Sequence, residues 1–227
     1  MSIKVLGLNA SPRGSESRTL RLVEAVLDGA RSLGATTSIV DVYSLEIEYC
    51  TACTACYASG ECTLCDDFPA LFERMMDADG IVLGAPNYID SIPAPMKAIF
   101  DRMADAVHCR MFTGKYGCSV STAGGPNFDP ILEYMNHALS SFGAITVGGV
   151  GVSVGRGLQA LPEAEEKARA LGHTLVRSIR GEILYPEQEE MQRQRREYFR
   201  QLILWNKDRW THEYDWYARM GWMEEKV

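Results

Sequence analysis

A chain of 227 residues with 46% hydrophobic residues is long enough to bury one complete core, so one main domain is expected. Its formal net charge of −7 argues against a nucleic-acid partner, which would need a basic face. No apolar run approaches the length of a membrane span, and the N-terminus lacks the features of a signal peptide. We therefore expect a cytoplasmic protein with no membrane partner, whose seven cysteines stay reduced unless a metal holds them.

Apolar, β-branched runs alternate with amphipathic stretches through the first 185 residues. The predicted strands cover residues 3–9, 37–42, 80–85, 116–121 and 144–152, and the predicted helices cover residues 19–33, 68–76, 95–107, 130–142 and 163–179. Because the strands are apolar throughout rather than alternating, they predict a parallel sheet with helices on both faces. The predicted fold class is therefore α/β, a doubly wound five-stranded parallel sheet.

The strand order 2-1-3-4-5 is preferred over the other common doubly wound order. That other order carries a G-x-G-x-x-G turn after the first strand, and residues 7–14 do not match this pattern. Glycines do recur later, at Gly149, Gly151 and Gly155, but their spacing is one residue too wide. We interpret them as positions of close packing along the last strand.

Residues 186–227 differ in composition from the rest, being rich in charged and aromatic residues and poor in glycine. All four tryptophans lie here, at Trp205, Trp210, Trp216 and Trp222. That much aromatic surface must be buried, so these residues predict a helical arm that packs on its own domain or, preferably, on a partner subunit. The chain is thus divided into a domain at 1–185 and an arm at 186–227.

The loop after the first strand is dense in anion-binding groups. Hydroxyls come from Ser11, Ser17 and Thr19, and charge comes from Arg13 and Arg18. The following helix adds the free N–H groups of its N-terminus, so the loop is expected to bind a phosphate. A serine-rich helix cap is the simpler alternative.

Two further loops follow the third and fourth strands, at the same edge of the sheet. In an open parallel sheet, ligands bind at this carboxyl edge. Tyr88 offers an aromatic face, and Gly124 and Gly125 allow the backbone to approach a ligand closely. Together the two loops predict a slot for a flat heterocycle, with the candidate residues Pro86, Asn87, Tyr88, Ile89, Thr122, Ala123, Gly124 and Gly125.

Five cysteines fall within sixteen residues, at Cys50, Cys53, Cys56, Cys62 and Cys65. The first four read C-x2-C-x2-C-x5-C, in which three thiolates can wrap one side of an inorganic core and a fourth can close it. We expect a [4Fe–4S] cluster on the first four, with Cys65 as the alternative fourth ligand. Zinc on the last four and free or redox-active thiols are the other interpretations.

Beyond this run, the cysteines and histidines suggest no chemistry. Cys109 and Cys118 are expected to be buried as small hydrophobic residues. The four histidines share no spacing, so we expect each to have a surface or capping role.

The segments SPRGSESRT, GAPNYIDSIPAPMKAIFDR and STAGG resemble the flavodoxin-like NADPH-dependent FMN reductase family over most of residues 1–180. The cysteine segment followed by Asp66 and Asp67 is similar to that of the iron–sulfur flavoproteins of anaerobic archaea and bacteria. The resemblance implies FMN in the three loops and a [4Fe–4S] cluster on Cys50, Cys53, Cys56 and Cys62. It also implies assembly as a homodimer or homotetramer.

The expected function is a flavin-dependent oxidoreductase that passes electrons between cluster and FMN. Its expected partner is a ferredoxin-like carrier or a small acceptor such as a quinone, and no side chain is expected to act as a catalytic acid or base. The alternatives are a cluster-free NAD(P)H-dependent FMN, quinone or nitroaromatic reductase, and a non-enzymatic flavodoxin-like electron carrier.

Overall fold

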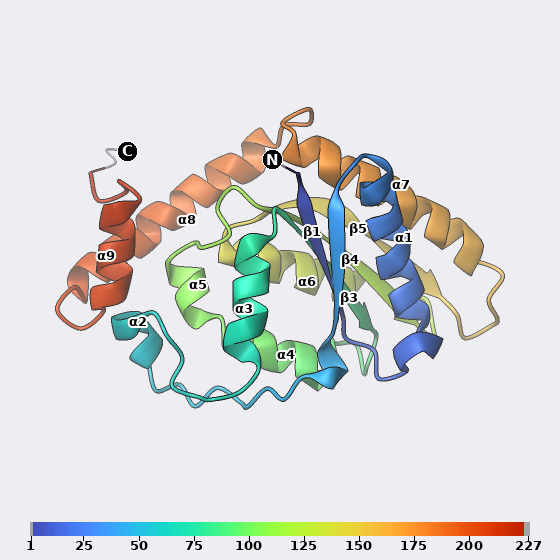
Figure 1. Cartoon of the computed structure of the whole chain (residues 1–227), viewed down its shortest axis with the longest axis horizontal. Helices are drawn as coiled ribbons and strands as arrows, with labels where there is room; N and C mark the ends of the chain where they lie inside the picture. The colour runs from blue at the N-terminus through green and yellow to red at the C-terminus, as the bar shows by residue number, and fades with distance from the viewer. Residues whose placement is uncertain (1, 225–227) are drawn as a thin grey trace.

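The computed structural model describes residues 2–224 and contains one five-stranded sheet in which all neighbouring strands are parallel (Figure 1). The strand order is β2-β1-β3-β4-β5, which confirms the predicted fold class and order. Each strand lies within two residues of its predicted limits. The strands are β1 (Lys4–Asn9), β2 (Thr36–Asp41), β3 (Gly80–Pro86), β4 (Tyr116–Ala123) and β5 (Ile145–Ser153).

Helices cover both faces of the sheet, as the continuous apolar strands required. One face packs against α1 (Arg18–Ser32) and α7 (Leu161–Ile179) and the other against α3 (Phe68–Asp77), α4 (Ala94–Asp101), α5 (Ala104–His108) and α6 (Asp129–Phe142). In the central strand β3, Val82 packs in the core beneath α1 and α7. Ile81 and Leu83 pack in the core on the opposite face, beneath α3 to α6. All three are fully buried, which is why the strand sequence shows no polar alternation.

The single helix predicted at 95–107 is wrong, because the structure divides it into α4 and α5. The break falls at Arg102 and Met103. Met103 remains buried in the same core as the helices on either side, so the apolar pattern continues through the break and conceals it. Arg102 is 5% exposed, and its guanidinium forms an ion pair with Asp66 at 2.6 Å.

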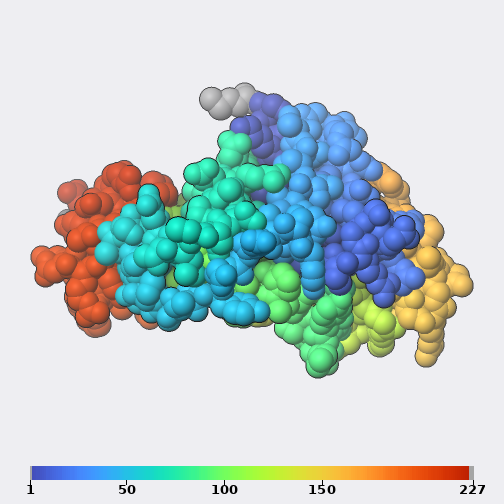
Figure 2. All heavy atoms as spheres, turned by 60° about the horizontal axis from the view of Figure 1, so that its bottom comes forward, coloured from blue at the N-terminus to red at the C-terminus, as the bar shows by residue number. Residues whose placement is uncertain are grey.

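The cysteine segment runs from β2 to α3 along the carboxyl edge of the sheet. It contains one short helix that the sequence did not predict, α2 (Ala55–Ser59). This helix ends at Gly60, whose φ of +76° lies in the left-handed region that glycine adopts without strain. Figure 2 shows this segment in cyan at the front of the molecule, in contact with the red C-terminal arm.

The arm consists of α8 (Pro186–Trp205) and α9 (Thr211–Arg219), and it packs on its own domain. Along α8, Gln188 Nε2 donates to the carbonyl oxygen of Thr146 at 2.9 Å, and Gln192 Nε2 donates to that of Ala144 at 3.0 Å. At the start of α9, Thr211 Oγ1 donates to the carbonyl oxygen of Ala58 in α2, at 2.9 Å. The arm therefore reaches the cysteine segment, and packing on a partner subunit stays a prediction.

Aromatic rings from four parts of the chain meet where the arm joins the domain. His108 of α5 lies 4.7 Å from Tyr57 of α2, 5.0 Å from Phe199 of α8 and 5.3 Å from Trp210 before α9, between ring centroids. The tryptophans have different environments: Trp222 is 7% exposed, whereas Trp205 is 86% exposed. Trp205 is therefore not buried by its own chain, and its burial on a partner subunit stays a prediction.

Two of the four histidines pair with carboxylates at a half-buried junction instead of having the expected surface or capping role. His108 is half-buried, and its Nδ1 lies 2.9 Å from Oε1 of the buried Glu213. His212 is also half-buried, at the same junction. The prediction failed because the carboxylates that partner these histidines are about a hundred residues away in the sequence.

Within the described residues, no helix is long and apolar enough to cross a membrane.

Gly60 offers a test of how closely α9 docks on α2. A Cβ added at Gly60 would lie 2.4 Å from Nδ1 of His212, whereas one added at Gly181, whose φ is +75°, would meet no atom within 4 Å. We expect Gly181→Ala to lose about 1 kcal/mol of unfolding free energy from the left-handed backbone alone. Gly60→Ala should lose a further ~1–3 kcal/mol from the clash, measured by urea unfolding. Equal losses would contradict the close docking.

Candidate functional site

The three predicted loops meet at one cavity of about 190 Å³ at the carboxyl edge of the sheet, here called the edge cavity. Ten of the thirteen residues predicted to bind a phosphate and a heterocycle line it. Val154 and Gly155 also line it, and the sequence analysis did not assign either of them to the site. The lining residues are Ser11, Arg13, Arg18, Thr19, Pro86, Asn87, Tyr88, Thr122, Ala123, Gly124, Val154 and Gly155.

The remaining three predicted residues do not line the edge cavity, and they differ in position. Ser17 is fully buried and caps α1, since its Oγ accepts a hydrogen bond from the backbone N–H of Leu20 at 3.0 Å. Ile89 is fully exposed at the tip of its loop, with a φ of +52° that is unusual for a β-branched residue. Gly125 lies beside the cavity-lining Gly124, and a Cβ on it would meet no atom within 4 Å.

The first and third loops are joined by a hydrogen bond between hydroxyls. Thr19 Oγ1 lies 2.8 Å from Thr122 Oγ1, and both residues are buried. Ser11 is 3% exposed and faces the same cavity, which the N-terminus of α1 also borders. Hydroxyl donors and a helix N-terminus together suit an anion, so the donors present fit a phosphate group.

The loop after β5 completes the edge cavity by packing against the loop after β4. A Cβ on Gly155 would lie 1.9 Å from the carbonyl oxygen of Gly124, so only glycine allows the two backbones to come this close. Gly151 packs closely as well, with a Cβ position 2.0 Å from the ring of Phe128. The expected close packing is therefore confirmed, and the position of Gly155 directly after the last strand, at the carboxyl edge, is the signal that could have located it at the site.

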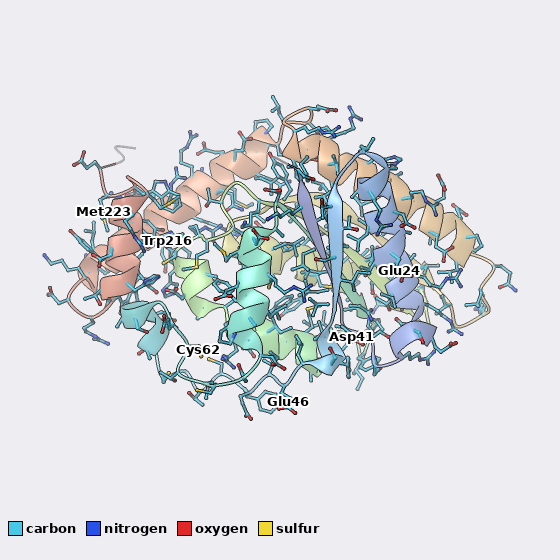
Figure 3. All side chains as sticks on the ribbon, viewed as in Figure 1. Glu24, Asp41, Glu46, Cys62, Trp216 and Met223 are labelled. Atoms are coloured by element: carbon cyan, nitrogen blue, oxygen red, sulfur yellow. The ribbon has the colours of Figure 1, made fainter. Side chains whose placement is uncertain are left out.

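The cysteine segment encloses a second cavity of about 360 Å³, here called the cysteine cavity. All four predicted ligands line it, whereas Cys65, although it lies within the described part of the chain, does not. Figure 3 labels Cys62, on the segment between α2 and α3. The lining residues are Cys50, Thr51, Ala52, Cys53, Thr54, Cys56, Tyr57, Cys62, Leu64, Asp101, Arg102 and Ala104.

The spacing of these thiols suits a core larger than a single ion. Four sulfur atoms around one zinc ion, at Zn–S distances of about 2.3 Å, would lie roughly 3.8 Å apart. Among the described residues, no three of the run's cysteine sulfurs lie within 4.8 Å of one another. The cysteines thus surround a space, and this arrangement fits an iron–sulfur core better than a zinc ion.

The backbone around Cys53 adopts a conformation that ordinary residues avoid. Ala52 has a φ of +52° and Thr54 a φ of +60°, and each costs about 1–2 kcal/mol relative to the right-handed region. A backbone that alternates in this way can turn successive N–H groups toward an anion. The strain at two non-glycine residues is typical of a segment shaped by the group it binds.

The thiols of the cavity differ in acidity. The backbone N–H of Ala55, followed by the hydroxyls of Thr63 and Thr51, lowers the pKa of Cys53 below its ordinary value. Burial, followed by the nearby carboxylate of Asp105, raises the pKa of Cys56 to about 11. Cys53 is therefore the readier thiolate, and Cys56 keeps its proton at neutral pH until a metal displaces it.

Arg102, which sequence reasoning missed, is the one cationic side chain among the lining residues of the cysteine cavity. Its Nη1 donates to Asp66 Oδ2 at 2.6 Å and to the carbonyl oxygen of Glu48 at 3.0 Å, and its guanidinium lies 4.6 Å from the ring centroid of Phe68. Burial would lower its pKa, but hydrogen bonding and charge from Asp66 and Cys62 outweigh burial and raise it. A fixed positive charge beside four thiolates would offset their negative charge.

The buried ion pair predicts a pH dependence of stability. Burial raises the pKa of Asp66, but the hydrogen bonds from Arg102 and two backbone N–H groups outweigh burial and hold it below 3.8. A lowered pKa means that the pair stabilises the fold above pH 3.8, and that this contribution is lost as the pH falls through the folded-state value. We expect Asp66→Asn to cost about 3–5 kcal/mol at pH 7, because it leaves Arg102 buried without its partner.

The difference in unfolding free energy between wild type and Asp66→Asn, measured by urea unfolding, should become smaller below about pH 4. The matched control is Asp77→Asn, which removes an ion pair with Lys4 at 2.8 Å in which both side chains are more than half exposed. It should cost less than about 1 kcal/mol. If the difference in unfolding free energy between wild type and Asp66→Asn stayed constant from pH 7 to pH 3, the stabilising role of the Arg102–Asp66 ion pair would be contradicted.

A family model and two relatives of known name all relate this chain to flavin-dependent proteins. The model of the NADPH-dependent FMN reductase family matches residues 3–159. An iron–sulfur flavoprotein of Archaeoglobus fulgidus is 30% identical over 198 residues, which cover 85% of this chain and 88% of the relative. An iron–sulfur flavoprotein of Methanosarcina thermophila is 31% identical over 150 residues, covering 64% and 78%.

A solved structure supports the fold. The NAD(P)H:quinone oxidoreductase of Methanothermobacter marburgensis superimposes with a TM-score of 0.59 at 21% identity, covering 77% of this chain and 98% of that one. At this identity the likeness concerns the fold alone. The family match and the relatives go further: the chain is a flavin-dependent oxidoreductase that belongs to the NADPH-dependent FMN reductase family and, within it, to the iron–sulfur flavoproteins.

Proposed function

We propose that this protein passes electrons between a [4Fe–4S] cluster held by Cys50, Cys53, Cys56 and Cys62 and an FMN bound at the edge cavity. The observation that carries the proposal is the cysteine cavity itself. It is lined by the four cysteines of the C-x2-C-x2-C-x5-C pattern and by Arg102, and Cys65 lies outside it. The names of the two iron–sulfur flavoproteins agree with this assignment.

The FMN part of the proposal is supported by the family match and by the donors of the edge cavity. Ser11, Thr19 and the N-terminus of α1 would bind the phosphate. At about 190 Å³ the cavity is smaller than most pockets that enclose a whole small molecule. The ring would therefore extend beyond it, with Tyr88, which is 45% exposed, offering an aromatic face.

When bound, FMN can exchange one or two electrons, and a [4Fe–4S] cluster exchanges one. Together the two groups would link two-electron transfer to one-electron transfer. The chain's own residues would bind, orient and shield these groups. The backbone N–H groups of Gly124 and Gly125 would donate to the pyrimidine edge of the ring. Arg102, whose guanidinium packs on the ring of Phe68, would keep a positive charge at the cysteine cavity. No side chain is assigned as a catalytic acid or base.

We further propose that the electrons pass to a ferredoxin-like carrier or to a small acceptor such as a quinone, and that the protein acts as a homodimer or homotetramer. The exposure of Trp205 at 86%, Leu184 at 74% and Tyr198 at 65%, in or beside α8, supports a partner along this helix.

A cysteine series tests the cluster assignment. Protein purified without oxygen should be brown and carry about four irons and four labile sulfides per chain. Single replacement of Cys50, Cys53, Cys56 or Cys62 by serine should lower both contents at least several-fold, because each removes one thiolate ligand. Cys65→Ser is the matched control from the same segment and should keep both.

Two outcomes would contradict the assignment. Yellow, iron-free wild-type protein that still oxidises NAD(P)H would favour the cluster-free reductase. Loss of iron in Cys65→Ser, with retention in Cys62→Ser, would move the fourth ligand to Cys65.

A threonine pair tests the edge cavity. Thr19→Val removes the hydroxyl that contacts Thr122 at the cavity while keeping the shape of the side chain. We expect the Kd for FMN to rise about ten-fold, as expected for the loss of a buried hydroxyl donor to a charged group, measured by quenching of flavin fluorescence. Thr174→Val, on the solvent side of α7, should leave the Kd unchanged. Equal effects of both replacements would rule out Thr19 as an FMN contact.

A further inference from the structure

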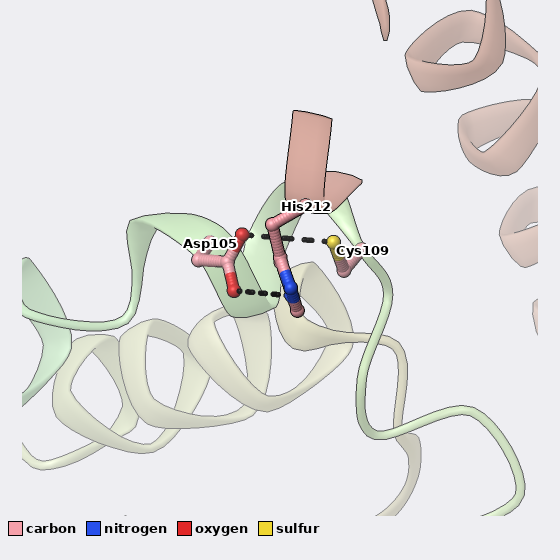
Figure 4. A group of neighbouring side chains, drawn as sticks. All are labelled: Asp105, Cys109 and His212. Carbon is pink, nitrogen blue, oxygen red and sulfur yellow. Dashed lines mark hydrogen bonds and ion pairs between the residues drawn. The ribbon is translucent and has the colours of Figure 1, made fainter. Parts of the chain in front are cut away.

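Three potential metal ligands converge where the arm meets the domain, outside the cysteine cavity. Asp105 and Cys109 are four residues apart in and just after α5, and His212 reaches them from α9 (Figure 4). Their ligand atoms all lie within 4.8 Å of one another. Cys109 is fully buried, Asp105 is 7% exposed, and the side chain of His212 is 18% exposed. The three are brought together by tertiary structure and form no sequence motif.

Cys109 Sγ and His212 Nε2 each lie near a different carboxylate oxygen of Asp105, at separations of the size found between the ligands of a zinc ion. Cys109 Sγ lies 3.6 Å from Asp105 Oδ1, and His212 Nε2 lies 3.4 Å from Asp105 Oδ2. With Zn–S of about 2.3 Å and Zn–N and Zn–O of about 2.0–2.2 Å, tetrahedral geometry separates sulfur from oxygen by roughly 3.6 Å and nitrogen from oxygen by roughly 3.4 Å. Thiolate, imidazole and carboxylate are also the donors that zinc takes in proteins.

The charges around the three residues favour a divalent cation. A thiolate and a carboxylate would balance Zn²⁺ and give a neutral unit, which a buried position tolerates best. Glu213 adds a second carboxylate at this junction: it is fully buried, and its Oε2 has no hydrogen-bond partner among the described residues. His212 Nε2 is likewise buried and makes no hydrogen bond within the described part of the chain. A buried ring nitrogen without a hydrogen bond, 3.4 Å from a carboxylate oxygen and within 4.8 Å of a thiol, suits a metal ligand.

We propose that Asp105, Cys109 and His212 bind a zinc ion, with water as the fourth ligand. Water can reach the site because Asp105 also lines a cavity of about 400 Å³ beside the cysteine cavity. The ion would join α5 to α9, and the ring of its ligand His212 packs against Gly60, where α2 ends. Since α2 carries Cys56, the zinc would hold in place the helix that borders the cysteine cavity. The proposal concerns separate residues and does not depend on the cluster or on FMN.

The first test counts metals in the full-length protein, purified without oxygen and without chelators, after equilibration with zinc chloride and removal of the excess. Mass spectrometry of the elements should find about one zinc per chain in addition to any iron. X-ray absorption at the zinc edge should find one sulfur at about 2.3 Å and three nitrogen or oxygen atoms at about 2.0–2.2 Å. A zinc-free protein would overturn the proposal, and so would a shell of four sulfurs, which belongs to the cysteine run.

Matched variants test the ligands. Cys109→Ser and His212→Asn should each lower the bound zinc about ten-fold or more while leaving the iron content unchanged. The controls are Cys118→Ser, which changes the other fully buried cysteine outside the run, and His137→Asn, which changes an exposed histidine of α6. Both should keep their zinc. Because His212 is partly exposed, His212→Asn remains informative if Cys109→Ser fails to fold.

The variant results separate this proposal from the function proposed above. Zinc retained in both Cys109→Ser and His212→Asn would overturn the zinc site, as would equal loss in the controls. Loss of iron in the run's cysteine variants, with zinc retained, would support both assignments at once. Iron-free protein that still binds one zinc ion with a single sulfur ligand would contradict the cluster proposal and support the zinc site.

Discussion

The buried ion pair between Arg102 and Asp66 holds both ends of the segment that carries the five cysteines. Asp66 Oδ2 accepts from the backbone N–H of Glu48 at 2.7 Å, and Arg102 Nη1 donates to the carbonyl oxygen of the same residue at 3.0 Å. Asp66 Oδ1 accepts from the N–H of Phe68, where α3 begins. The pair therefore closes a loop from residue 48 to residue 66, and the order of that loop depends on it. Removing either partner would leave the other charge buried alone.

A loop closed at its base still needs support at its far end, and the arm provides it. Thr211 binds the carbonyl of Ala58, Tyr57 packs against Trp210, and Gly60 allows the ring of His212 to approach. The left-handed residues Ala52 and Thr54 lie between these two points of support. Strained backbone persists only where its surroundings hold it, and here both ends of the segment are held. Contacts within the chain thus support the cysteine cavity at both ends of its segment.

The sheet and the edge cavity could be predicted because local sequence determines them. Each strand is a short apolar run, and each loop of the edge cavity directly follows a strand, so the parallel topology alone brings the loops together. Cys62 could be preferred over Cys65 by loop length, and the lining of the cysteine cavity agrees with that preference. Arg102 could not be predicted, since it lies in an apolar pattern that continues through the break between α4 and α5. His108 and His212 were misjudged because their partners are distant in the sequence.

The two cavities differ in what makes them rigid, and this difference explains the arm. The edge cavity is built from strand ends, so the sheet itself fixes its shape. The cysteine cavity is built from a segment with one helix of five residues, which has too little buried surface to be stable alone. Such a segment needs external contacts, and α9 supplies them from the other end of the chain. The C-terminal arm therefore supports the cysteine segment from outside, through the contacts of α9 with α2, although none of its described residues lines the cysteine cavity.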